Sequence, residues 1–286
     1  MTPSIGGNTT MCLAYPPWVR VVLAALALWR WFAVWAVSAL VLLATDPPIT
    51  PPVLVRLSAV GIAAPFVLEQ ILRWRFRART SSDGDTLVLE FRQFRLEIPR
   101  ERLRGIEPWG VPLPAPGLSL LLADGTRLRE RIEVADPYAW AQVHGLPWET
   151  PASVLQQASV ALAHSRAQQP RWRWYHYATK FAVFALLPAA LLFQVHQHIA
   201  YGSLWGEYYL RGLSSYLRTW CVYYGTVVID LLLYAGLWRS ATEVALWLGC
   251  MFRPDLAPAL RSLGERACSL GYYVGVIALL ALRFLG

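Results

Sequence analysis

The stretch Arg73-Trp-Arg-Phe-Arg-Ala-Arg79 divides the chain into two kinds of sequence. An apolar segment ends here, and a segment with alternating apolar and polar residues follows. Because Lys and Arg gather at the cytoplasmic ends of membrane helices, the four arginines predict that a helix ends inside the cell and a soluble domain begins. Their alternate spacing would place Arg73, Arg75, Arg77 and Arg79 on one face of an extended strand. We therefore expect a connector that faces anionic lipid headgroups.

The composition favours a polytopic membrane protein. The chain is 56% hydrophobic and 15% charged, against about 25% charged in typical soluble proteins, and it holds 14 tryptophans. Residues 81–165 carry eleven acidic and eight basic side chains, a net charge of −3. Because the whole chain has a net charge of +8, the remaining residues carry about +11. Basic residues at helix ends fit membrane topology and anionic lipids, and this distribution argues against nucleic acid as a partner.

Residues 20–79 are predicted to form a helical hairpin with two membrane spans. The apolar segments 21–44 and 53–74 are each long enough to cross a hydrocarbon core of about 30 Å. The turn between them holds four prolines and no basic residue, which places it outside the cell. Residues 1–19 are polar and rich in proline, and we interpret them as a cytoplasmic N-terminal tail rather than a signal peptide.

Residues 80–168 are predicted to form a small cytoplasmic β-domain. Segments 86–92, 94–98 and 103–109 alternate as half-buried strands do. The Asp124-Gly125 turn between segments 118–122 and 126–134 predicts a hairpin. A closing helix over 150–168 is expected from Thr150 as N-cap and Pro151 at the first helical position.

The run "LEFRQFRLEIPRERLRGIEPW…PAPGLSLLLADGTRLR" resembles the bacterial pleckstrin-homology-like (PH-like) domains that are attached to membrane helices. The shared features are Ile98-Pro99 at a strand end, the hydrophobic position Ile106, and the hairpin Asp124-Gly125-Thr126-Arg127. The resemblance covers residues of about 80–165. It implies a curved β-sheet capped by a helix and a role in binding or assembly, with no catalytic residues.

Residues 169–286 are predicted to form a second membrane block with three spans, over 181–202, 221–238 and 269–285. Segment 203–220 is aromatic but too polar to span, so we expect it in the outer interface. Segment 241–267 is expected on the inner side. Basic residues at the entrance of this block would join the four arginines in a collar at the membrane surface, namely Arg171, Arg173 and Lys180.

Ionisable groups within predicted spans each cost several kcal/mol unless they are paired or wetted. Besides Arg56, which can reach the outer interface, and the two histidines discussed below, they are Arg30, Glu69 and Asp230. Glu69 lies near the inner end of its helix and can reach the interface, and a tilted first helix would make Arg30 interfacial too. Asp230 lies near mid-span, with Arg30, His196 or His198 as candidate partners. We favour an interhelical hydrogen bond for Asp230 over proton, cation or substrate handling.

His196, His198 and Glu207 are of the types that bind zinc, copper or iron. Residues i and i+2 of a helix point about 200° apart, however, so metal or haem ligation is the alternative and interfacial polar residues are the prediction. Gly271 and Gly275 are spaced as in a helix-packing face. No GxSxG, HExxH or P-loop motif occurs.

The fold class expected from the sequence is thus a polytopic α-helical membrane protein of about five spans with an inserted PH-like β-domain. The sequence favours a non-enzymatic accessory, assembly or scaffolding subunit of a complex in the bacterial inner membrane, without a cofactor. Its expected partners are anionic lipids and other membrane proteins. The alternative is a transporter or membrane enzyme that handles an ion or lipid around Asp230 and His196/His198.

Overall fold

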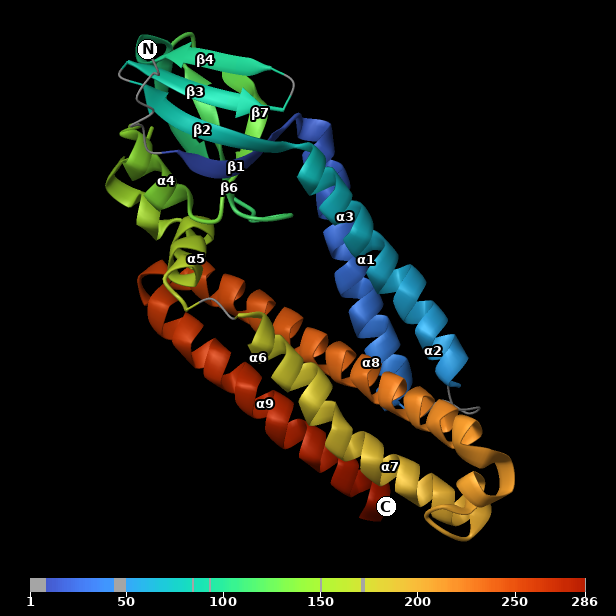
Figure 1. Cartoon of the computed structure of the whole chain (residues 1–286). Coiled ribbons are helices and arrows are strands. Elements are labelled where there is room, and N and C mark those ends of the chain that lie inside the picture. Colours follow the sequence, from blue (N-terminus) through green and yellow to red (C-terminus); the bar gives the residue numbers. More distant parts are fainter. Residues whose placement is uncertain are drawn as a thin grey trace. The chain divides into compact units, whose positions relative to one another are not determined.

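The computed structural model describes residues 9–43, 50–83, 85–92, 94–149, 151–170 and 173–285 (Figure 1). The chain divides into two compact units. The first, here called the sheet unit, comprises residues 1–30, 65–170 and 243–264. The second, the helical unit, comprises residues 31–64, 171–242 and 265–286.

The sheet unit contains a seven-stranded antiparallel sheet with the strand order β4-β3-β2-β1-β7-β6-β5. Its strands are β1 (Thr10–Tyr15), β2 (Arg77–Asp83), β3 (Thr86–Phe91), β4 (Arg95–Pro99), β5 (Leu103–Pro108), β6 (Gly117–Leu122) and β7 (Arg127–Glu133). One face buries an apolar core with residues such as Leu89, Leu120 and Ile132, which are fully buried. The strands expected from alternation are all present, as is the hairpin at Asp124-Gly125.

Strand β1 corrects the predicted tail over residues 1–19. It lies in the middle of the sheet and pairs with β2 on one side and β7 on the other. Ala14 and Tyr15 are completely buried. The segment Met-Cys-Leu-Ala has no polar alternation because its outward side chains are also apolar, so the period-2 signal of a half-buried strand is missing.

Helix α4 (Pro137–His144) covers the core face, and α5 (Ala158–Ala167) packs in a separate apolar cluster with Leu246, Cys250 and Ala257. Asp136 caps α4 by accepting from the N–H groups of Tyr138 and Ala139, and Gly145 ends it with a positive φ of 60°. The closing helix predicted over 150–168 is in fact a 3₁₀ turn, Pro151–Gln156, followed by α5.

The hairpin consists of α1 (Pro17–Leu42), α2 (Pro51–Ser58), a π-helical turn (Ala59–Ala63) and α3 (Ala64–Arg75). Since α3 ends at Arg75 and β2 begins at Arg77, the four arginines do not form one extended connector. Arg73 and Arg75 are helical, whereas Arg77 and Arg79 are exposed on one face of β2. The expected shared face therefore holds for only two of the four.

The remaining helices are α6 (Trp174–Ala178), a π-helical turn (Thr179–Val183), α7 (Phe184–Tyr201), α8 (Gly206–Phe252), the 3₁₀ turn Pro254–Leu256 and α9 (Ala257–Leu285). In the helical unit, α7, α8 and α9 pack around Ala189, Leu231 and Tyr272. Among the described residues, five helices are long and apolar enough to cross a membrane.

Helix α8 corrects the predicted interfacial segment over 203–220. It is broken only at Gly212, which has non-helical angles (φ 80°, ψ 173°), and runs on without interruption to Phe252. At 1.5 Å per residue this second part is about 60 Å long, roughly twice a hydrocarbon core. Residues 241–252 therefore continue the helix instead of starting a separate element.

Candidate functional site

The hairpin and the sheet are joined by two short connections. Helix α1 begins two residues after β1 ends, and β2 begins two residues after α3 ends. The backbone N–H of Ala14 also donates to the carbonyl of Phe76 (3.1 Å). Tyr15, Val19, Leu23 and Trp109 are buried together at this junction, against Leu13, Leu72 and Phe76. The ends of the hairpin are thus part of the same core as the outer face of the sheet.

A series of charged side chains, here called the ion-pair chain, runs through this junction. Arg30 of α1 contacts Glu69 of α3 (Nη1 to Oε2, 2.8 Å), and Glu69 also contacts Arg73 one turn later (3.0 Å). Arg73 in turn pairs with Glu133 of β7. Tyr15 of β1 completes the series by donating its hydroxyl to Glu133 (2.7 Å). Four elements from distant parts of the sequence therefore meet through alternating charges.

Both carboxylates of the ion-pair chain are buried, with Glu69 4% and Glu133 5% exposed. Burial raises the pKa of Glu133, and this effect outweighs the opposing attraction of Arg73 and the hydrogen bond from Tyr15. Burial also raises the pKa of Tyr15 above its usual range, so its hydroxyl stays protonated and remains a donor. Two arginines balance two carboxylates, so the ion-pair chain has no net charge.

Arg20 continues the polar surroundings of the junction. Its guanidinium lies 3.9 Å from the centre of the Trp109 ring, within the range of a cation–π interaction. The same group donates to the carbonyls of Val111 and Leu113 (3.1 and 3.2 Å). The loop after β5 is thereby attached to the first turn of α1.

The structure brings together two of the three predicted membrane-embedded polar residues. Arg30 and Glu69 form an ion pair with each other, and both belong to the sheet unit. Asp230 lies in the helical unit, half-buried in α8. The partnership of Arg30 with Glu69 was missed by the sequence reasoning, which treated each as a separate interfacial group.

The predicted ligands His196, His198 and Glu207 do not converge. His196 lies against the rings of Tyr223 and Tyr201, His198 is exposed, and Glu207 is 2% exposed. Glu207 accepts from the Gln197 amide (2.7 Å), the Ser215 hydroxyl (2.8 Å) and the Thr219 hydroxyl (2.7 Å). Within the described parts of the chain no three His, Cys, Asp or Glu side chains are grouped as a metal site. Glu207 instead holds the turn between α7 and α8.

The residues of the predicted basic collar are divided between the two units. Arg73 belongs to the ion-pair chain, Arg75, Arg77, Arg79 and Arg173 are exposed, and Arg171 lies outside the described residues. Lys180 of the helical unit lies over the ring of Tyr272 (4.1 Å). The Lys180 ammonium group therefore packs against α9, and its role at a lipid surface stays a prediction.

Gly271 and Gly275 face α8 within the helical unit. A Cβ atom on Gly271 would lie 2.9 Å from the Trp238 ring, and one on Gly275 would overlap the hydroxyl of Tyr234. That hydroxyl donates to the carbonyl of Gly271 (3.2 Å). The two glycines thus allow aromatic side chains of α8 to approach the backbone of α9.

A second polar cluster, around His144, gave no signal in the sequence. Its Nε2 atom lies 2.9 Å from the Thr10 hydroxyl and 3.1 Å from the Thr80 hydroxyl, and Trp140 donates to Thr80 (3.1 Å). His144 is 1% exposed, and burial lowers its pKa, with a further contribution from Arg100. The cluster joins β1, β2 and α4 inside the core.

Comparison with known protein families, curated proteins and solved structures gave no match to this chain.

Proposed function

We propose that the protein is a non-enzymatic accessory or scaffolding subunit of a complex in the bacterial inner membrane. In this proposal the sheet is an interaction module of the PH-like type, and the five apolar helices anchor it in the bilayer. The observation that carries the proposal is the junction: the sheet takes its central strand from before the first helix and shares the ion-pair chain with the hairpin.

A sheet attached in this way has a fixed orientation relative to the ends of α1 and α3. Such rigidity suits a module that presents a surface to a partner, because less conformational freedom is lost on binding. The sheet face beside the junction carries two exposed cations at alternate positions of β2, Arg77 and Arg79. Met11 of β1, which is 70% exposed, lies beside Arg79. An exposed Met next to arginines is of the composition found in protein interfaces.

The proposal includes an orientation with the sheet in the cytoplasm. The positive-inside rule supports it, since Arg73, Arg75, Arg77 and Arg79 lie where α3 ends and the sheet begins. By chain order, the turn between α7 and α8 would then lie outside the cell.

Cysteine labelling tests this orientation directly. In a Cys221→Ser background, which removes the one exposed native cysteine among those described, Glu97→Cys on β4 and Ser203→Cys before α8 each introduce an exposed thiol. A membrane-impermeant maleimide applied to intact spheroplasts should label Ser203→Cys alone, and both after permeabilisation. Labelling of Glu97→Cys in intact cells would refute the orientation.

The role as a subunit is tested by affinity purification from native membranes after cross-linking in the bilayer. We expect a stoichiometric protein partner that is retained by the parent and by Arg95→Glu, on the edge strand β4. The double variant Arg77→Glu/Arg79→Glu should lose it without loss of folded protein. Isolation of the parent alone under every mild detergent condition would contradict the proposal.

A further inference from the structure

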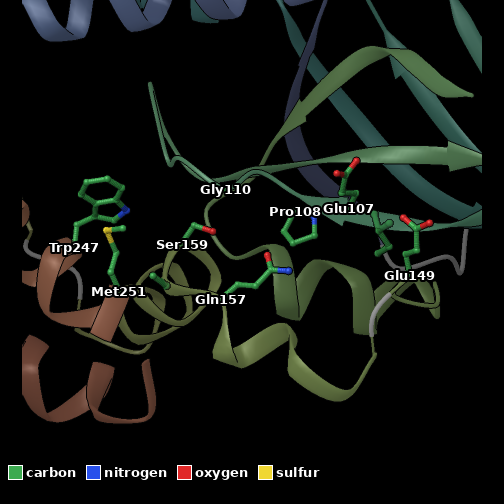
Figure 2. Close-up of a pocket in the computed structure, with 10 residues that line it drawn as sticks. Glu107, Pro108, Gly110, Glu149, Gln157, Ser159, Trp247 and Met251 are labelled. Carbon is green, nitrogen blue, oxygen red and sulfur yellow. The ribbon is translucent and has the colours of Figure 1, made fainter. Parts of the chain in front are cut away.

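The sheet unit contains a cavity of about 640 Å³ that the proposed function does not use. Its walls are the end of β5 with the residues that follow it, Glu149 after α4, the first turn of α5, and the part of α8 that belongs to this unit. The volume lies in the range of small-molecule sites, about 300–1,000 Å³. Figure 2 shows side chains from all of these elements around one space.

One end of the cavity offers hydrogen-bond donors without partners. Ser159 is 4% exposed, and its hydroxyl has no hydrogen-bond partner among the described residues. The indole N–H of Trp247 is also buried and has none within the same described set. Both residues line the cavity, Ser159 from α5 and Trp247 from α8 (Figure 2). Buried donors without partners cost free energy, so a bound acceptor would recover it.

The backbone strengthens this end of the cavity. Helix α5 is ten residues long, and its N-cap residue, Gln157, makes no side-chain hydrogen bond to the first turn. The first N–H groups of a helix lack partners within the helix, and together with the helix dipole they favour an anion. Ser159 stands in that first turn, so the hydroxyl, the indole and the helix end all favour an anionic oxygen group.

The other end of the cavity carries acceptors. Glu107 and Glu149 lie on the side away from Trp247 and Met251 (Figure 2). Glu107 pairs with Arg127 (2.7 Å), and the Glu149 carboxylate lies 3.5 Å from the Arg104 guanidinium. A carboxylate has about four lone-pair positions, so each can accept further hydrogen bonds from a cation. An anion alone would be repelled here, whereas an ammonium group would be attracted.

The lining also includes apolar side chains of Ile106, Pro108 and Ala158, and the Gln157 amide lies between the two ends (Figure 2). Donors at one end and carboxylates at the other match a molecule that carries two opposite charges. We propose that this cavity binds a small zwitterion. Its phosphate or carboxylate would lie at Ser159, Trp247 and the start of α5, and its ammonium group at Glu107 and Glu149.

The phosphoethanolamine group combines these features, either in a soluble compound or as the headgroup of a lipid. The site does not depend on the proposed role as a subunit, because every residue that lines it belongs to the sheet unit.

Isothermal titration calorimetry of the full chain in a maltoside detergent tests the proposal with three probes. Glycerophosphoethanolamine carries both charges, glycerol phosphate only the anion, and ethanolamine only the cation. We expect the zwitterion to bind at least about tenfold more tightly than either half, since each charge-assisted contact contributes about a factor of ten or more. Equal binding of glycerol phosphate and the zwitterion, or no heat with the zwitterion, would overturn the proposal.

Variants that each remove one donor locate the site. Ser159→Ala removes the hydroxyl and Trp247→Phe removes the indole N–H, and each should weaken binding of the zwitterion by about tenfold. The matched control is Ser165→Ala on the same helix, a buried serine whose hydroxyl already donates to Leu162 (2.9 Å). Unfolding curves of each variant report whether it folds. If the folded Ser159→Ala and Trp247→Phe variants bind like the parent, the cavity is not the binding site.

Neutralising a carboxylate tests the other end of the cavity. Glu149→Gln should weaken binding of the zwitterion by about tenfold, because the ammonium group loses a partner. Binding of glycerol phosphate should stay unchanged or become tighter. Glu97→Gln, on an exposed strand position, is the control. A uniform loss with both probes would contradict the assignment of the two ends.

The source of the zwitterion is found by competition with phosphatidylethanolamine in mixed micelles. Displacement of the soluble compound identifies a lipid headgroup, and retention identifies a free metabolite of the same chemistry. Binding of neither compound would overturn the proposal.

Discussion

Glu69 in the sheet unit and Glu207 in the helical unit are both buried carboxylates, with 4% and 2% of their surface exposed, but their partners differ in kind. Glu69 lies between the guanidinium groups of Arg30 and Arg73. Glu207 is held by an amide and two hydroxyls, from Gln197, Ser215 and Thr219. The first arrangement cancels charge by ion pairing, and the second spreads it over neutral dipoles.

The separation of the partners along the sequence differs as well. The partners of Glu207 all lie between residues 197 and 219, so that carboxylate fixes a local turn. The ion-pair chain joins residues 15, 30, 69, 73 and 133, which come from four different elements. Of these two carboxylates, the ion-paired Glu69 belongs to a network that joins distant segments, and the neutrally hydrogen-bonded Glu207 holds a place where the chain folds back on itself.

The largest effect is expected from Glu69→Gln. This change keeps the shape of the side chain but removes the buried charge to which Arg30 and Arg73, 24% and 22% exposed, both pair. Removing one partner of a buried ion pair costs about 3–5 kcal/mol of unfolding free energy. Denaturant titration in detergent measures it, and a double-mutant cycle with Arg30→Met should recover part of the loss.

The control for Glu69 is the exposed pair of Arg95 and Glu97 on β4, whose side chains are 58% and 56% exposed. Glu97→Gln should change the unfolding free energy by less than about 1 kcal/mol, because surface ion pairs contribute little. If the two variants lost similar amounts, the ion-pair chain would be no more than a surface interaction.

A smaller loss is expected from Glu207→Gln. The amide keeps one acceptor oxygen, and hydroxyls such as those of Ser215 and Thr219 can rotate to accept from its NH₂ group. We therefore expect a loss of about 1 kcal/mol, the usual net worth of a neutral hydrogen bond. The same denaturant titration measures it. A loss larger than that of Glu69→Gln would reverse the comparison between the two regions.

The parts of the fold that the sequence predicted are those that local signals specify. The hairpin at Asp124-Gly125 depends on adjacent residues, and the five apolar helices depend on length and composition. Strand β1 was missed because it pairs with residues about 65–70 and 120 positions away and has apolar side chains on both faces. No periodicity within Thr10–Tyr15 carries that information.

The candidate site shows the same limit. Charge within an apolar segment singled out Arg30, Glu69 and Asp230, but composition does not say which charges meet. Arg30 was considered as a partner of Asp230 and is in fact paired with Glu69. Glu133 and Tyr15 belong to a strand and a predicted tail, where a charge or a hydroxyl is ordinary and gives no warning.

A pH-dependent effect of about 1 kcal/mol or less is expected from His144, which shows that the sheet unit also buries neutral polar groups. Its folded-state pKa lies below the ordinary value of 6.5, because burial and Arg100 both disfavour the charged ring. As the pH falls below about 6.5, the unfolded chain binds a proton that the folded chain does not, so stability decreases toward acid. One proton changes the unfolding free energy by at most about 1.4 kcal/mol per pH unit.

Unfolding free energies at pH 7.5 and pH 5.5 should therefore differ more in the parent than in His144→Gln, by about 1 kcal/mol. An unchanged slope in His144→Gln would mean that the buried ring is protonated as easily as an exposed one. The core of the sheet would then tolerate a charge on His144 beside the hydroxyls of Thr10 and Thr80.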